Sequence, residues 1–500
     1  MILSDVLPVL ENMGLCVIDE WPQEIVLENA DRIWINDFGV KSLQTESVDV
    51  VQVKEIFQEA FFKIWSGEAE NDGFNRLILS VHLTWREVSI LRAYTKYLRQ
   101  ISVPFSQVYI ENVVARNANI AKILIQLFQH YFSPKNQNVS KSVTDNLEKN
   151  LQTALDTVVS LDEDRILRCL FEVLQATLRT NYFQTNKLGK PKKCLAFKLS
   201  PAHISDLPLP KPLYEIFVYS PRVEGVHLRA AKVARGGIRW SDRSEDFRTE
   251  ILGLWKAQNV KNALIVPAGA KGGFVCKRLL PGGNRETIMN EVVLCYQTFI
   301  RGLLDLTDNL KNGTLVSPHD TICRDTDDPY LVVAADKGTA EFSDIANAIS
   351  AKYDFWLGDA FASGGSVGYD HKKIGITARG AWKSVERHAR ALGLDPNKDD
   401  FTAIGIGDMS GDVFGNGLLL SRHIKLVAAF NHLHIFIDPN PDPEKSFAER
   451  QRLFNLHRST WQDYAPSLIS NGGGVFNRSQ KFISLSPETK QLLDLNKDFI

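Results

Sequence analysis

A chain of 500 residues that is 44% hydrophobic and 23% charged has the composition of a folded protein, with room for roughly two to four domains. Its formal net charge of −1 excludes the global basic field that nucleic acid or a membrane surface would attract. No apolar run is long enough to span a membrane, and we expect no signal peptide. Six cysteines without a CxxC pair are typical of reduced thiols, so we expect a cytoplasmic protein.

The first 50 residues predict a small α+β piece. A helix is expected over residues 3–13, and strands are expected over residues 15–18 and 32–38. A piece of this size is too small to hold a good core alone. We therefore expect residues 1–50 to be the remnant of a larger regulatory domain.

Residues 51–186 predict a helical module, because apolar residues recur there at the spacing that lines one helix face. The main helices are expected over residues 84–101, 106–116, 117–132, 143–159 and 162–182. The aromatic residues of this region fit a core better than a cofactor site, and no chemistry is predicted in it. The basic segment at 187–193, KLGKPKK, marks the boundary to the next domain.

Strand patterns begin after this boundary. They cover residues 195–199, 214–219, 226–233 and 331–335, with helices expected over residues 285–304 and 339–351. The last strand ends at Asp336 and a helix follows, which is the α/β arrangement that places reactive groups in a crevice. We expect residues 194–362 to form one domain with a mixed sheet. The acidic residues Asp325, Asp327 and Asp328 predict a solvated turn.

Two glycine-rich turns are predicted, at Gly236–Gly237 and at Gly269–Gly273, on either side of a helix that ends at Lys261. Glycine lets a backbone approach a ligand closely, because it has no Cβ. The basic side chains of Arg235, Arg239, Lys261 and Lys271 lie on or beside these turns and suit an anionic substrate, such as a carboxylate or a phosphate. The alternative is that the glycines only make turns and the basic side chains are solvated.

A second glycine run lies between two strand patterns, at residues 401–406 and 425–430, with a helix expected over 413–422. The run contains Gly405, Gly407, Asp408, Met409 and Gly411. In a dinucleotide-binding fold such glycines make a tight turn that the pyrophosphate can approach. The glycine spacing is one residue longer than the common form, and Asp408 and Asp412 add negative charge, so a plain βαβ turn is the alternative.

An acidic side chain beyond the second strand would bind a ribose hydroxyl in such a fold. Asn431 lies nearest the expected position and is not acidic, whereas Asp438, after a strand over residues 434–437, comes somewhat late. His432 and His434 would face one side of that strand, but no cysteine or carboxylate nearby completes a ligand set. No metal site is therefore expected.

Taken in order, these motifs resemble the glutamate dehydrogenase superfamily, and more narrowly the large NAD-specific glutamate dehydrogenases of bacteria. The resemblance covers about residues 200–480, and the N-terminal half is similar to the ACT-like and helical regions that precede the catalytic domain in these enzymes. The motifs that carry it are Arg235–Arg239, Lys261–Asn262, Pro267–Gly273, Ala335–Gly338, Gly364–Ser366, Thr377–Gly380 and the glycine run from Gly405.

The resemblance implies a role for each matching residue. Lys271 would be the catalytic lysine, and Asp336 would move a proton to and from the amino group of the substrate. The substrate-binding residues would be Arg235, Gly236, Gly237 and Lys261, with Lys261 on the α-carboxylate and Arg235 on the side-chain carboxylate. Arg235 stands where other members have a lysine, and arginine can pair with a carboxylate bidentately. The cofactor-binding residues would be Thr377, Gly405, Gly407, Asp408, Met409, Gly411 and Asp438.

The implied function is oxidative deamination of L-glutamate to 2-oxoglutarate and ammonia, with hydride transfer to NAD. The implied fold is α/β: a substrate domain with a mixed sheet and a Rossmann-like nucleotide domain over residues 363–500, preceded by the helical module and an ACT-like piece. A homo-oligomer is implied for the full-length enzyme. A dehydrogenase of another amino acid and a non-catalytic fragment are the alternatives.

We also expect the chain to be a fragment that lacks both ends of such an enzyme. It stops soon after Gly472–Gly474, and only two or three strands are predicted after Phe401. A doubly wound sheet has about five or six strands.

Overall fold

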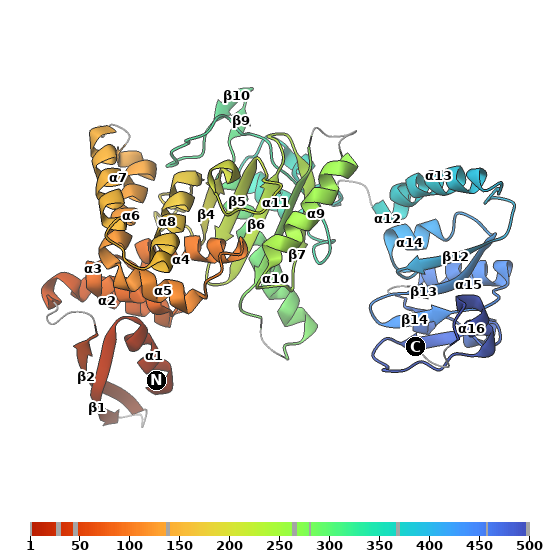
Figure 1. Ribbon diagram of the computed structural model, residues 1–500, viewed down its shortest axis with the longest axis horizontal. Helices are drawn as coiled ribbons and strands as arrows, with labels where there is room; N and C mark the ends of the chain where they lie inside the picture. The colour runs from red at the N-terminus through yellow and green to blue at the C-terminus, as the bar shows by residue number, and fades with distance from the viewer. Residues whose placement is uncertain are drawn as a thin grey trace. The chain divides into compact units, whose positions relative to one another are not determined.

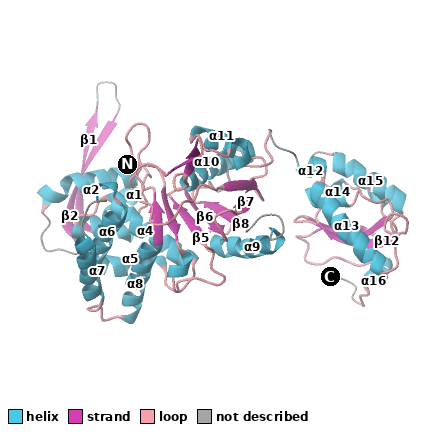
Figure 2. Cartoon of the chain, turned by 90° about the horizontal axis from the view of Figure 1, so that it is seen from above, coloured by secondary structure: helices cyan, strands magenta, loops and turns pink. Residues whose placement is uncertain are grey.

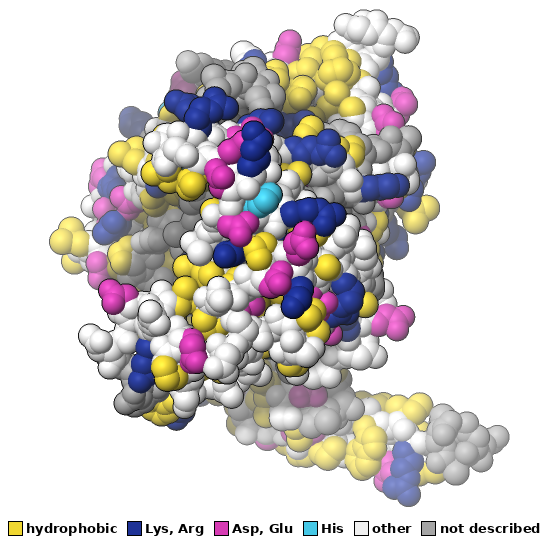
Figure 3. All heavy atoms as spheres, turned by 90° about the vertical axis from the view of Figure 1, so that its right-hand side faces the viewer, with side chains coloured by type: hydrophobic (Ala, Val, Ile, Leu, Met, Phe, Trp, Pro, Cys, Tyr) yellow, Lys and Arg dark blue, Asp and Glu magenta, His cyan; other side chains and the backbone are white. Residues whose placement is uncertain are grey.

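The computed structural model describes residues 3–26, 32–43, 49–136, 141–262, 268–279, 282–366, 371–456 and 459–496, without the side chains of residues 141, 260–262, 371 and 372. Contacts divide the chain into two compact units, residues 1–365 and 366–500 (Figure 1). Across the described segments, no helix is long and apolar enough to cross a membrane. On the face drawn in Figure 3, acidic and basic side chains are interspersed, in keeping with the net charge near zero.

The first unit opens with helix α1 (Leu3–Asn12) and an antiparallel hairpin of β1 (Leu15–Val26) and β2 (Arg32–Ser42). Both strands are longer than the sequence predicts, because pairing continues from Leu15 opposite Ser42 to Val26 opposite Arg32. Most side chains of the hairpin are exposed. Along much of its length, therefore, no alternation of buried and exposed residues indicates a strand in the sequence.

The predicted helical module follows. Its helices are α2 (Val50–Trp65), α3 (Arg76–Val81), α4 (Trp85–Gln100), α5 (Gln107–Arg116), α6 (Ala118–Phe132), α7 (Lys141–Leu155) and α8 (Leu161–Ala176). Helix α4 begins with a capping box, in which Thr84 and Glu87 satisfy each other's backbone N–H groups. Eleven of its residues are buried, so α4 is a central helix of this module.

The helix predicted over residues 162–182 is too long. Helix α8 ends at Ala176, and the chain continues directly as β3 (Thr177–Thr180). Thr177 and Arg179 therefore lie in a sheet. Arg179 is buried there and pairs with Asp308, with 2.7 Å between Arg179 Nη1 and Asp308 Oδ1. Because β3 pairs with a distant strand, a local helical pattern could not show the change.

A seven-stranded mixed sheet forms the centre of the first unit, in the order β11-β7-β8-β6-β5-β4-β3. Its other strands are β4 (Leu195–Leu199), β5 (Tyr214–Tyr219), β6 (Val223–Arg229), β7 (Arg235–Trp240), β8 (Ala270–Cys276) and β11 (Val332–Ala335). The pairs β11–β7 and β7–β8 are parallel, and the rest are antiparallel. The expected mixed sheet is therefore confirmed, with β6 shifted towards the N-terminus of the predicted strand.

Helices cover both faces of this sheet (Figure 2). Helix α9 (Phe247–Asn262) packs with the helical module on one face. Helices α10 (Arg285–Leu304) and α11 (Ser343–Lys352) pack on the other, and a short hairpin of β9 (Asn309–Lys311) and β10 (Thr314–Val316) follows α10. The two faces thus bury separate apolar cores.

The two predicted glycine-rich turns are wrong, because Gly236 and Gly237 lie in β7, Gly272 and Gly273 lie in β8, and Gly269 forms a bridge to Arg235 just before β8. A Cβ added to Gly236 would lie 1.5 Å from the carbonyl oxygen of Ala270. A Cβ on Gly273 would lie 2.3 Å from Cδ1 of Ile251 in α9. These glycines allow β7, β8 and α9 to pack closely, rather than allowing the chain to turn.

The predicted solvated turn is also wrong for two of its three aspartates. Asp328 is 1% exposed, and its Oδ1 and Oδ2 accept hydrogen bonds from Arg229 (2.9 Å) and Lys198 (2.6 Å). Asp325 bonds the buried side chain of Arg179, while Asp327 is exposed. Buried basic residues on β3, β4 and β6 attract these carboxylates, and nothing in the acidic run itself reveals those distant partners.

The second unit contains a four-stranded sheet of β12 (Phe401–Ile406), β13 (Ile424–Phe430), β14 (His434–Ile437) and β15 (Gly474–Asn477), in that order. Its helices are α12 (His371–Ile374), α13 (Ile376–Ala391), α14 (Asp412–Gly417), α15 (Pro443–Asn455) and α16 (Pro487–Leu493). Strands β12 and β13 are parallel, and the later pairs are antiparallel. The helix predicted after the glycine run is shorter than expected, since α14 ends at Gly417.

Candidate active site

Strand β8 places Lys271 on the face of the sheet that α9 covers. Gly273 is two residues further along the strand, on the same face, and faces Ile251 of α9. Lys271 is 7% exposed, and its Nζ forms an ion pair with Oδ2 of Asp336. Asp336 directly follows β11, which is joined to β8 through β7. The structure therefore brings the two residues predicted to be catalytic into direct contact.

The turn after β11 holds Asp336 in place. The backbone N–H of Lys337 donates to Oδ1 of Asp336 at 2.7 Å, and the N–H of Asp336 donates to Thr339 Oγ1 at 3.2 Å. Thr339 in turn donates to the carbonyl of Ile238 in β7 at 2.7 Å. Gly338 has φ +81°, a conformation that side chains disfavour, and a Cβ there would meet Trp240 at 2.9 Å. The carboxylate is thus held by a turn fixed to β7.

Arg239 and Glu250 belong to the same cluster. From the sequence, Arg239 is predicted only among the basic residues beside the glycines, without a catalytic role, and Glu250 is assigned none. Arg239 Nε lies 3.3 Å from Asp336 Oδ2, and its Nη1 lies 2.9 Å from Glu250 Oε1. Ser241 Oγ donates to Glu250 Oε2 at 2.6 Å. A strand has a period of two, which puts Arg235, Gly237 and Arg239 on one face of β7. This spacing is the sequence signal for the cluster, and the prediction of a turn in the same segment obscures it.

Burial is the largest influence on the pKa of Asp336 and raises it. The hydrogen bond and the charge of Lys271 lower the pKa, and the N–H of Lys337 and the guanidinium of Arg239 lower it further. The net result is a pKa below the ordinary value of an aspartate. Asp336 is therefore held in its carboxylate form.

The predicted substrate-binding residues lie along the start of β7. Arg235 begins the strand, and its Nη2 donates to Ser363 Oγ at 2.8 Å. A Cβ on Gly237 would lie 3.1 Å from the Cβ of Asp336, so the glycine leaves room for the Asp336 side chain. Lys261 lies in the last turn of α9, and its side chain is outside the described part of the chain.

In the second unit, the glycine run follows β12 as expected. Gly407 has φ +137°, and a Cβ on it would lie 2.9 Å from Phe414 Cδ2. A Cβ on Gly405 would lie 2.4 Å from Phe414 Cε2, while Gly411 is the N-cap of α14. The carboxylate of Asp408 accepts hydrogen bonds from the N–H of Ser410 (3.0 Å) and from Asn431 Nδ2 (2.7 Å). These bonds hold the loop and offset the negative charge of Asp408.

Two predicted cofactor residues are placed elsewhere. The Met409 side chain is 1% exposed and packs in the core of the second unit, so it does not line the loop surface. Asp438 is fully buried beside Val427, because β14 runs antiparallel to β13, whereas the N–H of Gly407 meets Phe430 at the other end of β13. The structure thus separates Asp438 from the glycine run.

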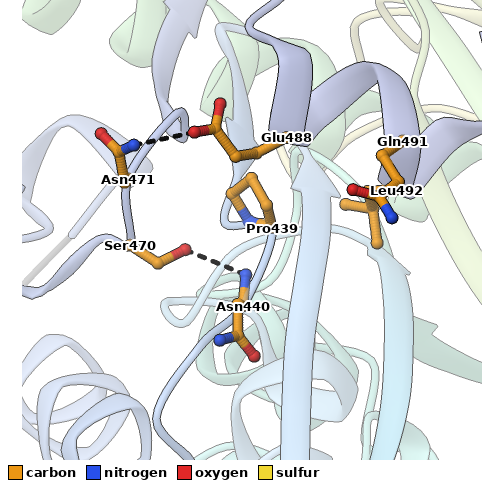
Figure 4. A pocket seen from close by; sticks show the side chains of 7 residues that line it. All are labelled: Pro439, Asn440, Ser470, Asn471, Glu488, Gln491 and Leu492. Atoms are coloured by element: carbon orange, nitrogen blue, oxygen red, sulfur yellow. Dashed lines mark hydrogen bonds between the residues drawn. The ribbon is translucent and has the colours of Figure 1, made fainter.

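Asp438 is instead bonded to Ser470, which lines a pocket of about 420 Å³ in the second unit (Figure 4). Its Oδ1 accepts a hydrogen bond from the N–H of Ser470 at 3.1 Å, and Ser470 Oγ accepts from the N–H of Asn440 at 2.9 Å. The pocket is lined by Pro439, Asn440, Ser470, Asn471, Glu488, Gln491 and Leu492. None of these is a predicted cofactor residue. Thr377, which is one, is exposed in the first turn of α13.

A mixed-sheet unit with a buried lysine–aspartate pair, together with a second unit whose glycine run joins parallel strands, defines the α/β class in which nucleotide-dependent dehydrogenases occur. A family model described as "Bacterial NAD-glutamate dehydrogenase, catalytic domain" matches residues 150–500. The chain belongs to this family. Models for glutamate dehydrogenase helical motif 3 and the ACT3 domain match residues 69–134 and 1–53, so the predicted fold class is confirmed.

Three bacterial relatives, each named NAD-specific glutamate dehydrogenase, are similar over 99% of this chain. The relative from Pseudomonas aeruginosa is 58% identical over 499 residues, and that from Halomonas elongata is 56% identical over 496 residues. The relative from Mycobacterium tuberculosis is 53% identical over 512 residues. The chain spans 31% of the length of each. The predicted resemblance to large bacterial NAD-specific glutamate dehydrogenases is confirmed.

Proposed function

We propose that the chain carries the catalytic part of an NAD-dependent glutamate dehydrogenase, which converts L-glutamate, NAD and water into 2-oxoglutarate, ammonia and NADH. The contact between Lys271 and Asp336 is the observation that carries this proposal. It is supported by 53–58% identity to proteins named NAD-specific glutamate dehydrogenase.

In this proposal, two cations hold the two carboxylates of glutamate. Arg235 pairs with the side-chain carboxylate, and Lys261 pairs with the α-carboxylate. A guanidinium can grip a carboxylate with two parallel hydrogen bonds. Leucine and phenylalanine lack the second carboxylate, so an arginine at position 235 favours an acidic substrate.

Lys271 and Asp336 move the protons. Asp336 takes a proton from the substrate amino group and returns it to that group as ammonia leaves. Lys271 gives up its own ammonium proton before its free amine takes a proton from the water that attacks the imine carbon. Because the two side chains touch, a proton can pass between them. NAD, when bound, supplies the acceptor for the hydride that leaves the α-carbon.

The described loop after β12 fits a bound dinucleotide. Gly405, Gly407 and Gly411 present backbone without side chains, and the bonds to Asp408 offset its negative charge. We assign NAD binding to these residues and Thr377, with Met409 contributing through its backbone. A homo-oligomeric assembly and a cytoplasmic location are further parts of the proposal.

The proposal is tested by measuring NADH formation with glutamate, aspartate and leucine on the full-length protein. Glutamate should be preferred, and Lys271→Ala should lower kcat by at least about 100-fold, the scale of general acid–base catalysis. Lys256→Ala, at an exposed position of α9, is the matched control and should leave the rate unchanged. Glutamate turnover that survives Lys271→Ala would contradict the assignment.

A further inference from the structure

We infer that Arg239 is a positioning residue that holds Asp336 against Lys271 during the proposed reaction. This inference rests on the proposed function and adds to it a residue outside the predicted catalytic and binding sets. Arg239 lies on the same face of β7 as Arg235, so it extends from the strand that would carry the substrate-binding arginine.

The guanidinium of Arg239 uses two different edges. On one edge, Nε lies 3.3 Å from Asp336 Oδ2 and Nη2 lies 3.5 Å from Oδ1. On the other, Nη1 lies 2.9 Å from Glu250 Oε1. A planar fork with fixed donors can bridge two carboxylates in this way, whereas an ammonium group cannot reach both with the same geometry.

Glu250 fixes the outer end of this bridge. It projects from the first turn of α9, and its Oε2 accepts a hydrogen bond from Ser241, just beyond the end of β7. Arg239 is therefore held between a helix and a strand. Its position does not depend on Asp336 alone, which is what a positioning residue requires.

The cluster balances its charge in a poorly solvated place. Lys271 and Arg239 are the cations, and Asp336 and Glu250 are the anions. Their side chains are between 9% and 20% exposed, so solvent screens these interactions weakly. Removing Arg239 would leave Lys271 as the one cation that the described structure pairs with Asp336, next to an unbalanced Glu250.

The expected consequence concerns both geometry and protonation. Burial raises the pKa of Asp336, and Arg239 is one of the groups that oppose this effect. Without Arg239 the pKa rises, so the proton-accepting carboxylate forms only at higher pH. A displaced carboxylate also slows the proton transfer, since a shift of about 1 Å can cost on the order of 100-fold in rate.

The test compares Arg239→Gln and Arg239→Lys with the unchanged full-length protein, in glutamate oxidation followed across pH. Arg239→Gln should lower kcat about 100-fold with little change in the KM for glutamate, and the acidic limb of the kcat profile should move to higher pH. Arg239→Lys should return the acidic limb of the kcat profile to its position in the parent protein, because lysine restores the positive charge. It should recover only part of the lost kcat. Arg243→Gln, at an exposed arginine paired with Asp246, is the matched control and should leave the profile unchanged.

Glu250→Gln provides a second variant in case Arg239→Gln does not fold. It keeps Arg239 and weakens its anchor, so we expect a smaller fall in kcat. An unchanged kcat profile in these variants, with glutamate activity present in the parent protein, would overturn the inference and leave the proposed function standing. Absence of glutamate activity in the parent protein would overturn both.

Discussion

Gly236 shows how a single missing Cβ affects the position of Lys271, the proposed catalytic lysine. It stands against Ala270, the residue before Lys271, with a carbonyl oxygen 1.5 Å from where its Cβ would be. Any side chain there must push β7 and β8 apart. The separation of Lys271 from the start of β7, where Arg235 lies, is therefore set by this glycine.

We predict that Gly236→Ala lowers the free energy of unfolding by about 3 kcal/mol, the cost of overpacking a rigid site. Gly253→Ala is the matched control, because Gly253 lies in α9 with nothing within 4 Å of its added Cβ. That change should raise stability by about 1 kcal/mol, through helix propensity. Urea unfolding of both variants measures the difference, and equal midpoints would contradict this account of β7.

At the scale of elements, the buried ion pairs join strands that are far apart in sequence. Arg229 of β6 and Lys198 of β4 both bond Asp328, in the segment that leads to β11. Since Asp336 directly follows β11, this network fixes the segment that carries one of the predicted catalytic residues. Removing one partner of a buried pair leaves uncompensated charge, which costs about 3–5 kcal/mol.

Asp328→Asn should therefore destabilise the protein at neutral pH by about 3 kcal/mol. Burial raises the pKa of Asp328, but Arg229 and Lys198 outweigh this and lower the pKa to about 2. This pKa is lower than the value of about 3.9 for an aspartate in an unfolded chain. The ionised Asp328 therefore stabilises the folded protein at pH values above about 3.9, and this stabilisation is lost as the pH falls towards about 2.

Thermal unfolding between neutral and acidic pH measures this effect. The parent protein should lose stability over the acidic range more steeply than Asp328→Asn. The exposed neighbour Asp327→Asn is the control and should behave as the parent does. Parallel curves for the parent protein and Asp328→Asn would show that the carboxylate contributes no pH-dependent stability.

Elements with a clear local pattern could be predicted from the sequence. The strands at residues 195–199, 401–406 and 434–437 and the helix at 285–304 have the predicted bounds, since apolar runs bounded by polar residues define them. The end of α8 could not be predicted, and at residues 236 and 237 the paired glycines favour a turn over the strand that the period of two also allows. In both places the strand forms because a strand elsewhere in the sequence pairs with it. The local spacing of apolar residues does not indicate that partner.

At the scale of the whole molecule, the sequence named Lys271 and Asp336 as catalytic candidates but could not show how they meet. Lys271 and Asp336 are far apart in the chain, and their contact depends on β11 lying beside β7 and β7 beside β8. Arg239 joins them through the same pairing. Asp438 is predicted from the sequence to lie near the glycine run, but the structure separates the two. Only the antiparallel pairing of β14 with β13 shows this separation.

The two units carry different parts of the proposed function, so substitutions in each should have separable effects. Lys271→Ala, in the first unit, should abolish turnover while leaving the affinity for NADH unchanged. Gly407→Ala, in the second, should weaken NADH binding about tenfold, because φ +137° strains any L side chain by about 1–3 kcal/mol and its Cβ would meet Phe414.

Fluorescence titration with NADH measures this affinity without requiring turnover. Gly417→Ala is the matched control, since it lies at the end of α14 with nothing within 4 Å of the added Cβ, and its affinity should equal that of the parent protein. Equal affinities for Gly407→Ala and Gly417→Ala would contradict the nucleotide role of the loop after β12. The same result would leave the chemistry proposed for Lys271 and Asp336 untouched, because those residues belong to the other unit.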